Sequence, residues 1–423
     1  MIAVIVVLVA IIAWSALSKV LDRRGVTPAL FLAAVGLAVG LFGPGVSDIR
    51  LEVAVAERVA EIALVLLLFS DATRLDLHAL RHQLNWPSRL LLIGLPLTML
   101  AGVGVGVLVF PGMALASVVL LAVMLAPTDA ALGQKVVTDA SVPPRVRQAL
   151  DVESGLNDGL AVPFFLVALS IANAEIDSGV AGAIVGSMGA QIGWGLAAGL
   201  AAGLGGGALF RIADDRGWIT KDWRQVLPLA SALLAFAVAD VLGGSGFIAA
   251  FVGGIVFGRI AGPARSVVSL FTEEAGELAA AVTWIAFGAL ALTAALPFVT
   301  WQVMLYAVLS LTIVRMLPVA IALAGRRIRR PTVWFIGWFG PRGLASLVFV
   351  LIAVEEGVPD QEVVLTTVLV TVALSILLHG LSSVPLVARY QSWWEAHRAG
   401  DPNAGESVDT AMPRARRELP PQE

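Results

Sequence analysis

Long apolar segments follow one another along nearly the whole chain, separated by short polar or glycine-containing connections. About thirteen of them approach the roughly 20 residues that a helix needs to cross a bilayer. They begin at Ile2, Pro28, Val59, Leu90, Ala114, Leu150, Val180, Val226, Phe247, Leu278, Trp301, Val333 and Val363. The third and ninth are short, and the seventh, residues 180–210, is long enough to be tilted or to contain a second crossing. The pattern predicts an all-α polytopic membrane protein.

Composition and charge support this class and give an orientation. The chain is 58% hydrophobic and only 14% charged, and it has no cysteine, which removes disulfides and thiolate metal sites from consideration. Of the 28 Lys and Arg residues, 24 fall in alternate connections on one side of the predicted membrane. By the positive-inside rule that side is cytoplasmic. We therefore expect the N-terminus outside and the C-terminus in the cytoplasm.

The sixth segment, LDVESGLNDGLAVPFFLVALSIA (150–172), carries the most unusual polar residues. A charge in mid-membrane costs about 3 kcal/mol or more, so it indicates a functional site. Side chains four apart share a helix face, so Ser154 lies beneath Asp158 and Glu153 beneath Asn157. Asp158 and the Ser154 hydroxyl are oxygen ligands suited to a monovalent cation. The alternative is that these groups only hold helices together.

Two segments contain helix breakers next to charges in mid-membrane, a pattern typical of a transporter's binding site. The fifth segment includes LAPTDAA around Pro127, and the twelfth includes FGPRG around Pro341. Each is the fifth segment of its half of the chain, and their separation by seven segments makes them antiparallel. The pattern predicts an inverted-topology repeat with two discontinuous helices that cross. Ordinary proline kinks are the alternative.

The charges at the two breaks suggest how the helix ends are neutralised. Broken helices leave dipole ends of roughly half a charge each. We assign Asp129 to the positive N-terminal ends and Arg342 to the negative C-terminal ends, with Thr128 and freed carbonyls available to an ion. Arg315 in the eleventh segment needs a partner, and Glu153 lacks one, so we pair them. Alternatively, Arg315 extends toward the cytoplasmic Arg cluster.

These motifs together resemble the monovalent cation:proton antiporters, specifically the NhaP and Na+/H+ exchanger branch. APTDAA, ESGLNDG in the next segment, an Arg in the eleventh and GPRG in the twelfth match that branch in order and approximate spacing. The resemblance extends from the third segment, FSDATRLDL around Asp71, to the last.

The resemblance implies an NhaA-like antiporter fold and a homodimer with elevator-like alternating access. It implies a transmembrane domain over 1–390, with core helices at about 90–172 and 301–388 and interface helices at about 1–72 and 180–296. A short disordered cytoplasmic tail would occupy 391–423. The residues that it carries over as ion- and proton-binding are Asp158, Ser154, Thr128, Asp129 and Asn157, with Glu153 and Arg315 as a structural pair.

The expected function is exchange of a monovalent cation, Na+ first and otherwise Li+ or K+, for H+ across a bacterial plasma membrane. Asn157 cannot titrate, so Asp158 alone would bind cation or proton in competition, and exchange would be electroneutral and one for one. The partners would be these small ions, the lipid bilayer and a second copy of the chain. We expect no cofactor, no nucleic acid and no enzymatic activity.

Two other classes fit parts of the pattern. Asp129 and Asp158 lie in adjacent segments, and paired carboxylates share a proton and activate water in an intramembrane aspartyl protease. The residues next to the two acids differ too much for paired roles. A cation channel needs a continuous polar path, and the polar patches here are short and isolated.

Two further features have no assigned role at this stage. His78 and His82 are four apart, a spacing that suits metal ligands or a pH sensor, but no third ligand is evident, and a solvated cytoplasmic helix is the favoured explanation. Four glycines recur at four-residue intervals in the seventh segment, Gly195, Gly199, Gly203 and Gly207. They form a smooth stripe for close packing, against the chain itself or a second protomer.

Overall fold

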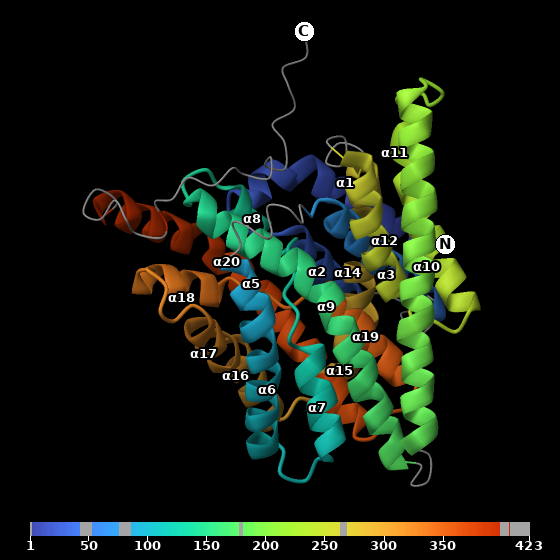
Figure 1. Cartoon of the computed structure of the whole chain (residues 1–423). Helices are drawn as coiled ribbons and strands as arrows, with labels where there is room; N and C mark the ends of the chain where they lie inside the picture. The colour runs from blue at the N-terminus through green and yellow to red at the C-terminus, as the bar shows by residue number, and fades with distance from the viewer. Residues whose placement is uncertain are drawn as a thin grey trace.

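The computed structural model describes residues 2–42, 53–75, 86–176, 181–262, 269–397 and Glu406. All regular structure in these ranges is helical (Figure 1). Eight of the described helices are long and apolar enough to cross a membrane, and four shorter apolar helices accompany them. The prediction of an all-α polytopic membrane fold is confirmed.

The helices follow the predicted segments closely. The first half contains α1 (Ile2–Asp22), α2 (Pro28–Phe42), α3 (Val53–Thr73), α5 (Pro87–Arg89), the π-helical turn η1 (Leu90–Gly94), α6 (Leu95–Val109), α7 (Leu115–Met124), α8 (Gln134–Thr138) and α9 (Pro144–Ile176). The second half contains α10 (Ala181–Asp215), α11 (Trp223–Val241), α12 (Gly246–Ala261), α14 (Leu270–Ala286), η3 (Phe287–Leu292), α15 (Thr293–Ala295), η4 (Leu296–Phe298), α16 (Trp301–Leu311), α17 (Ile313–Ala322), α18 (Arg330–Trp338), α19 (Leu344–Glu355) and α20 (Gln361–His397). The number of these that cross the bilayer stays a prediction.

Local sequence explains where several helices begin and end. Gly25, with φ of 78°, closes the turn after α1, and Pro28 begins α2, because proline suits the first turn of a helix. The Ser245 and Thr300 side chains accept hydrogen bonds from the third residues of α12 and α16. The eleventh segment is interrupted at Thr312, so α16 and α17 are separate helices. Together they form one apolar stretch, Trp301–Ala322, long enough to cross a membrane, as the eleventh segment predicts.

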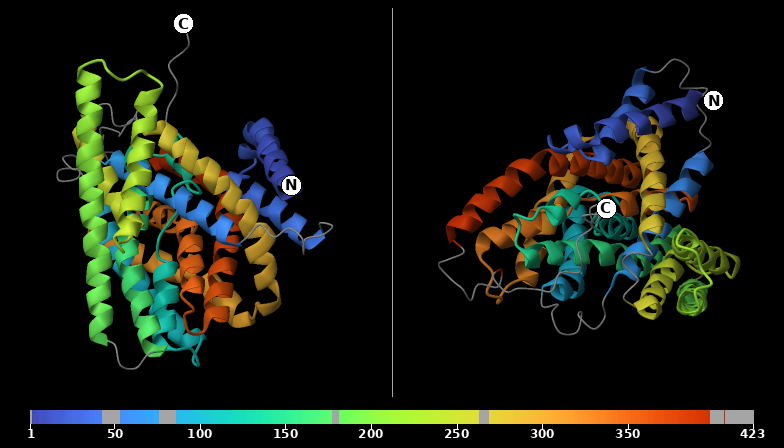
Figure 2. Two further views of the ribbon diagram at one scale, coloured as in Figure 1. Left: turned by 90° about the vertical axis from the view of Figure 1, so that its right-hand side faces the viewer. Right: turned by 90° about the horizontal axis from the view of Figure 1, so that it is seen from above.

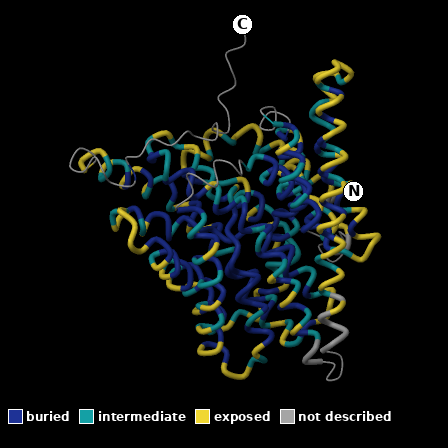
Figure 3. Tube along the Cα trace, viewed as in Figure 1, coloured by how far each residue is buried: buried dark blue, intermediate teal, exposed yellow. Residues whose placement is uncertain are grey.

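The helices surround a buried centre (Figure 3). Phe165 of α9 and Phe349 of α19 stack there with ring centroids 4.3 Å apart. Helix α1 lies at the edge of the bundle (Figure 2), and only 6% of its most apolar stretch is buried. Helix α10 is likewise peripheral and runs the height of the molecule at the right of Figure 1. The centre is therefore formed by the helices that carry the predicted ion site.

The seventh segment is one uninterrupted helix of 35 residues, α10, so it contains no second crossing. Its glycine stripe packs against α12 of the same chain. A Cβ at Gly199 would lie 2.6 Å from the carbonyl oxygen of Ala249, and one at Gly203 would lie 2.6 Å from that of Gly253. The close approach of the two backbones requires glycine there.

The last helix extends beyond the predicted domain boundary at residue 390. Helix α20 continues to His397, and its last turns are held by a hydrogen bond from Gln391 to Glu395 and by contact between the Tyr390 and Trp393 rings. The predicted disordered tail lies outside the described residues from 398 onward, except Glu406. That side chain is buried and accepts a hydrogen bond from the backbone amide of Arg329 at 2.9 Å.

We predict that Gly199→Ala lowers the unfolding temperature of the purified protein, because the new methyl group forces α10 and α12 apart. Gly205→Ala is the matched control: it lies on the same helix, and a Cβ there meets nothing within 4 Å. It should leave stability unchanged or raise it by up to about 1 kcal/mol through helix propensity. Equal thermal shifts for the two variants would contradict the packing argument.

Candidate ion-binding site

The two interrupted helices meet at the buried centre and run in opposite directions. Ser346 donates to the carbonyl of Met124 at 2.7 Å, and the amide of Asp129 donates to the carbonyl of Pro341 at 2.8 Å. From Met124 to Asp129 the first stretch therefore runs alongside the second from Ser346 back to Pro341, so the two are antiparallel. This is the antiparallel crossing that the sequence predicted, and the alternative of two ordinary kinks is excluded because α7 and α18 both end before their prolines.

Glycines in the second break admit charged side chains. A Cβ at Gly343 would collide with the carboxylate of Asp129, and one at Gly340 would collide with the guanidinium of Arg315. The sequence had suggested only that these glycines loosen the helix. Their more specific effect is to let two charges approach the unwound backbone.

Asp129 accepts hydrogen bonds from the turn that precedes α8 and from the N-terminus of α19. Its Oδ1 accepts from the amides of Ala131 and Leu132, at 2.8 and 3.1 Å, and its Oδ2 accepts from the amide of Leu344, the first residue of α19, at 3.0 Å. A carboxylate at this position neutralises the positive dipole end of α19.

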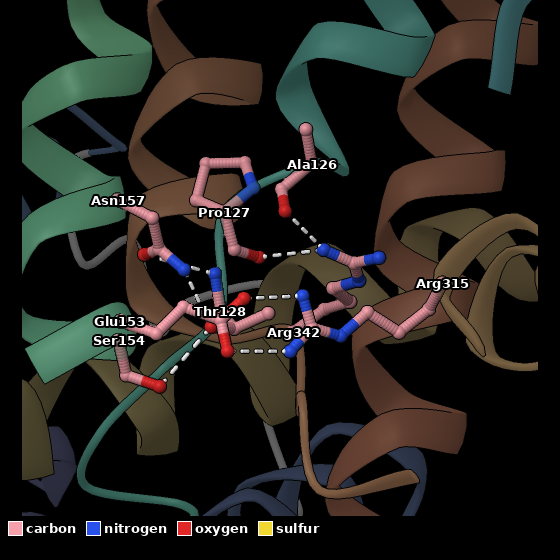
Figure 4. Close-up of polar contacts among 8 residues, drawn as sticks. All are labelled: Ala126, Pro127, Thr128, Glu153, Ser154, Asn157, Arg315 and Arg342. Atoms are coloured by element: carbon pink, nitrogen blue, oxygen red, sulfur yellow. Dashed lines mark hydrogen bonds and ion pairs between the residues drawn. The ribbon is translucent and has the colours of Figure 1, made fainter. Parts of the chain in front are cut away.

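Arg342 lies at only one of the two C-terminal ends. Its Nη1 donates to the carbonyls of Ala126 and Pro127, the latter at 3.0 Å, just beyond α7 (Figure 4). The end of α18 is instead bonded by His379, whose Nε2 lies 2.9 Å from the carbonyl of Trp338. The expectation that Arg342 serves both C-terminal ends is therefore corrected, because Arg342 itself lies beyond the end of α18 and points across to α7.

Glu153 and Arg315 form a two-pronged ion pair (Figure 4). Nη1 of the arginine lies 2.5 Å from Oε1 of the glutamate, and Nη2 lies 2.8 Å from Oε2. The side chains are 2% and 3% exposed, so the pair is shielded from water. Extension of Arg315 toward the cytoplasm is excluded.

Three polar residues join α9 to the first break. Asn157 accepts from the amide of Thr128 at 3.2 Å and donates to its hydroxyl at 2.5 Å, and the Thr128 and Ser154 hydroxyls lie 3.1 Å apart (Figure 4). All three residues are buried. The amide of Asn157 thus steadies the unwound segment and places two hydroxyl oxygens side by side.

Asp158 stands apart from these bonded groups. Its Oδ1 is buried and has no hydrogen-bond partner among the described residues. Two other carboxylates, those of Asp129 and Asp71, act on it electrostatically. Asp71 belongs to α3 and faces Gly155 of α9. Its Cβ atom lies 3.5 Å from the position that a Cβ on Gly155 would take.

Sequence reasoning did not assign Asp71 or His379 to the site. An acid within the third apolar segment was a signal for Asp71, but nothing in the sequence indicated which helix it faces. His78 and His82 lie outside the described residues.

Broken crossing helices with acids and hydroxyls at mid-bundle are typical of the class of secondary transporters. The chain belongs to the sodium/hydrogen exchanger family. The family model described as "Sodium/hydrogen exchanger, transmembrane" matches residues 5–389. The chain is therefore an integral membrane protein of a transporter family.

Several proteins with similar sequences are named as cation/proton antiporters. The K(+)/H(+) antiporter NhaP2 of Shewanella sp. (strain ANA-3) is 25% identical over 375 residues, which cover 86% of this chain and 63% of that protein. The Na(+)/H(+) antiporter NhaG of Bacillus atrophaeus is 25% identical over 287 residues, 66% of this chain and 53% of that protein. The chain thus spans less than two thirds of the length of these curated relatives.

A solved structure shares the fold. The sodium proton antiporter MjNhaP1 from Methanocaldococcus jannaschii at pH 8 superposes with a TM-score of 0.71 at 19% identity, covering 90% of this chain and 99% of that chain. The predicted antiporter fold is therefore confirmed.

We predict that Glu153→Gln and Arg315→Gln each destabilise the protein by about 3 to 5 kcal/mol, because each leaves a buried charge unpaired. The double variant should lose less than the sum of the single losses. Thermal unfolding in detergent measures this. The exposed pair Arg211 and Asp215, 3.9 Å apart, is the control and should show coupling below about 1 kcal/mol. Additive losses at Glu153 and Arg315 would contradict the pairing.

Proposed function

We propose that this chain is an antiporter that exchanges one monovalent cation for one proton across a membrane. Asp158 binds the cation or the proton in competition. The oxygens of Ser154 and Thr128 complete the cation site, with Asp129 beside it and Asn157 holding its geometry. The ion is a substrate, and the exchange uses no cofactor.

The observation that carries this proposal is the difference between Asp158 and the other charges of the site. Glu153 is paired with Arg315, Asp129 is bonded to three amides, and Arg342 is bonded to carbonyls of the other break. Asp158 alone among these described charges has a buried oxygen without a hydrogen-bond partner. It can therefore exchange one positive partner for another without breaking a structural contact.

The same contacts support the one-for-one stoichiometry. Asn157 cannot titrate, and both ends of its amide are engaged by Thr128. Asp129 accepts hydrogen bonds from three backbone amides, and protonating it would weaken these bonds, because a neutral carboxyl group is a poorer acceptor than a carboxylate. One exchangeable carboxylate moves one positive charge in each direction, and the cycle carries no net charge.

Hard monovalent cations prefer oxygen ligands, and the donors proposed here are carboxylate and hydroxyl oxygens. Na+ is our first candidate, with Li+ and K+ as alternatives. The relatives named above include K(+)/H(+) and Na(+)/H(+) antiporters. Rates of exchange in proteoliposomes with each cation in turn identify the substrate.

The proposed cycle is an elevator movement of the helices in 90–172 and 301–388 against the remaining helices. We place the protein in a bacterial plasma membrane as a homodimer, with its N-terminus outside and its C-terminus in the cytoplasm. Exposed apolar residues on α10, such as Leu196, Leu200 and Leu204, support contact with lipid or with a second copy.

We predict that Asp158→Asn abolishes exchange, because it removes the exchangeable charge at nearly constant volume. Proton flux is followed with a pH-sensitive dye inside proteoliposomes, for Na+, K+ and Li+ separately. Asp215→Asn, at the exposed end of α10, is the control and should exchange at the rate of the unaltered protein. Exchange by purified, folded Asp158→Asn at that rate would refute the site.

We also predict that the rate is insensitive to membrane potential and that the apparent cation affinity weakens as pH falls. Protons occupy Asp158 at low pH and so exclude the cation, whereas at high pH few protons return, which gives a bell-shaped rate profile. The measurement is the initial rate under imposed potentials of both signs, at several pH values. A rate or final distribution that follows the potential would mean that a second charge moves.

A further inference from the structure

His379 is a buried polar residue for which the exchange cycle above has no role. It lies on α20, is 1% exposed, and sits beside the second helix break. Both of its ring nitrogens have polar neighbours. Its surroundings therefore indicate a specific function rather than simple space filling.

The Nε2 atom of His379 lies 2.9 Å from the carbonyl oxygen of Trp338, the last residue of α18. A neutral imidazole carries one hydrogen, and we assign it to Nε2, because the Ser375 hydroxyl can then donate to Nδ1 while Nε2 donates to the carbonyl of Trp338. The bond supplies a donor to a carbonyl at the end of a helix, where no partner within the helix is available. The amide of Gly340 also donates to this oxygen, at 2.8 Å.

One turn earlier, Ser375 binds the other end of the same unwound stretch. Its hydroxyl oxygen accepts from the backbone amide of Arg342 at 2.6 Å. Nδ1 of His379 lies 3.3 Å from this hydroxyl and 2.9 Å from the carbonyl of Ser375. A single turn of α20 therefore holds the unwound chain at both Trp338 and Arg342.

The Trp338 side chain adds a third attachment. Its ring centroid lies 5.1 Å from that of His379, and its Nε1 donates to the hydroxyl of Ser382 at 3.0 Å. The stretch from Trp338 to Arg342 is thus fixed against α20, and its far end carries the guanidinium that reaches Ala126 and Pro127. Thr128 follows directly.

We propose that His379 is a positioning residue for cation binding. By holding the carbonyl of Trp338, together with Ser375, it sets the place of Arg342 and, through Arg342, the place of the first break and its Thr128 hydroxyl. The inference rests on the proposed cation exchange and adds a specific residue to it. His379 itself does not touch the ion.

The test compares His379→Leu, His379→Gln and Ser375→Ala with the unaltered protein in proteoliposomes. Leucine removes the His379 donor and leaves the Trp338 carbonyl with the Gly340 amide alone, so that α20 no longer holds it. We expect a roughly fivefold to tenfold higher KM for the cation, with the maximal rate within about twofold. Glutamine supplies an N–H at similar reach and should restore most of the affinity. Ser375→Ala should raise KM in the same direction, and the pair should be non-additive.

Thr371→Ala is the matched control, because Thr371 is also buried on α20 but donates within its own helix, to the carbonyl of Thr367. It should leave KM unchanged. Cation-dependent thermal stabilisation of each purified variant provides a binding readout that does not need transport. If the unaltered protein exchanges no cation, the proposed function fails and this readout still tests the inference.

Three results would overturn the positioning role: an unchanged KM for His379→Leu, equal losses for leucine and glutamine, or a KM increase for Thr371→Ala as large as that for leucine. If His379→Leu does not fold, Ser375→Ala and His379→Gln still decide. An unchanged KM for Ser375→Ala contradicts the proposal, and so does a KM for His379→Gln raised by the fivefold to tenfold expected of leucine.

Discussion

The structure depends on satisfying the backbone groups left where two helices are interrupted at its buried centre. Each half-helix end leaves backbone groups without intrahelical partners and a partial charge of roughly half a unit. The amides of the turn before α8 and of the start of α19 converge on Asp129, the carbonyls beyond α7 on Arg342, and the carbonyl that ends α18 on His379. Without these groups two helices could not be interrupted in a buried site, and no hydroxyls or carbonyls would be freed for an ion.

This neutralisation also determines which charge is available for exchange. Asp129 and Arg342 compensate backbone dipoles, and Glu153 compensates Arg315, so a change of charge on any of them would expose an unpaired group at a cost of several kcal/mol. Among the described contacts, the Oδ1 atom of Asp158 compensates no helix end and accepts no hydrogen bond. In the proposed exchange, the protein therefore keeps this geometry while Asp158 alternates between cation and proton.

Much of this arrangement could be predicted from the sequence, because it depends on local signals. Apolar segment lengths located the helices, Pro127 and Pro341 located the breaks, and two unmatched charges identified the Glu153–Arg315 pair. Features that depend on which helices become neighbours could not be predicted. Asp71 and His379 are distant in sequence from the breaks, and the collision that forbids a side chain at Gly343 exists only once Asp129 faces it. The sequence also assigned Arg342 to both C-terminal helix ends, whereas it binds only the carbonyls beyond α7. The direction of its side chain depends on how the two helices cross, which the sequence does not give.

The strength of the contacts differs between the interior of the proposed moving core and its boundary. Inside the core, the bonds are buried: Arg315 to Glu153 and Asp129 to α19 involve charges, and His379 and Ser375 of α20 bind the backbone of Trp338 and Arg342. At the boundary, Lys135 of α8 meets Asp22 of α1 at 2.9 Å, with side chains 29% and 55% exposed. Such an exposed pair contributes at most about 1 kcal/mol, and water replaces it readily. Helices joined by buried bonds are held together, whereas an exposed pair of this kind breaks at little cost, and this difference supports the proposed movement of the site as a rigid body.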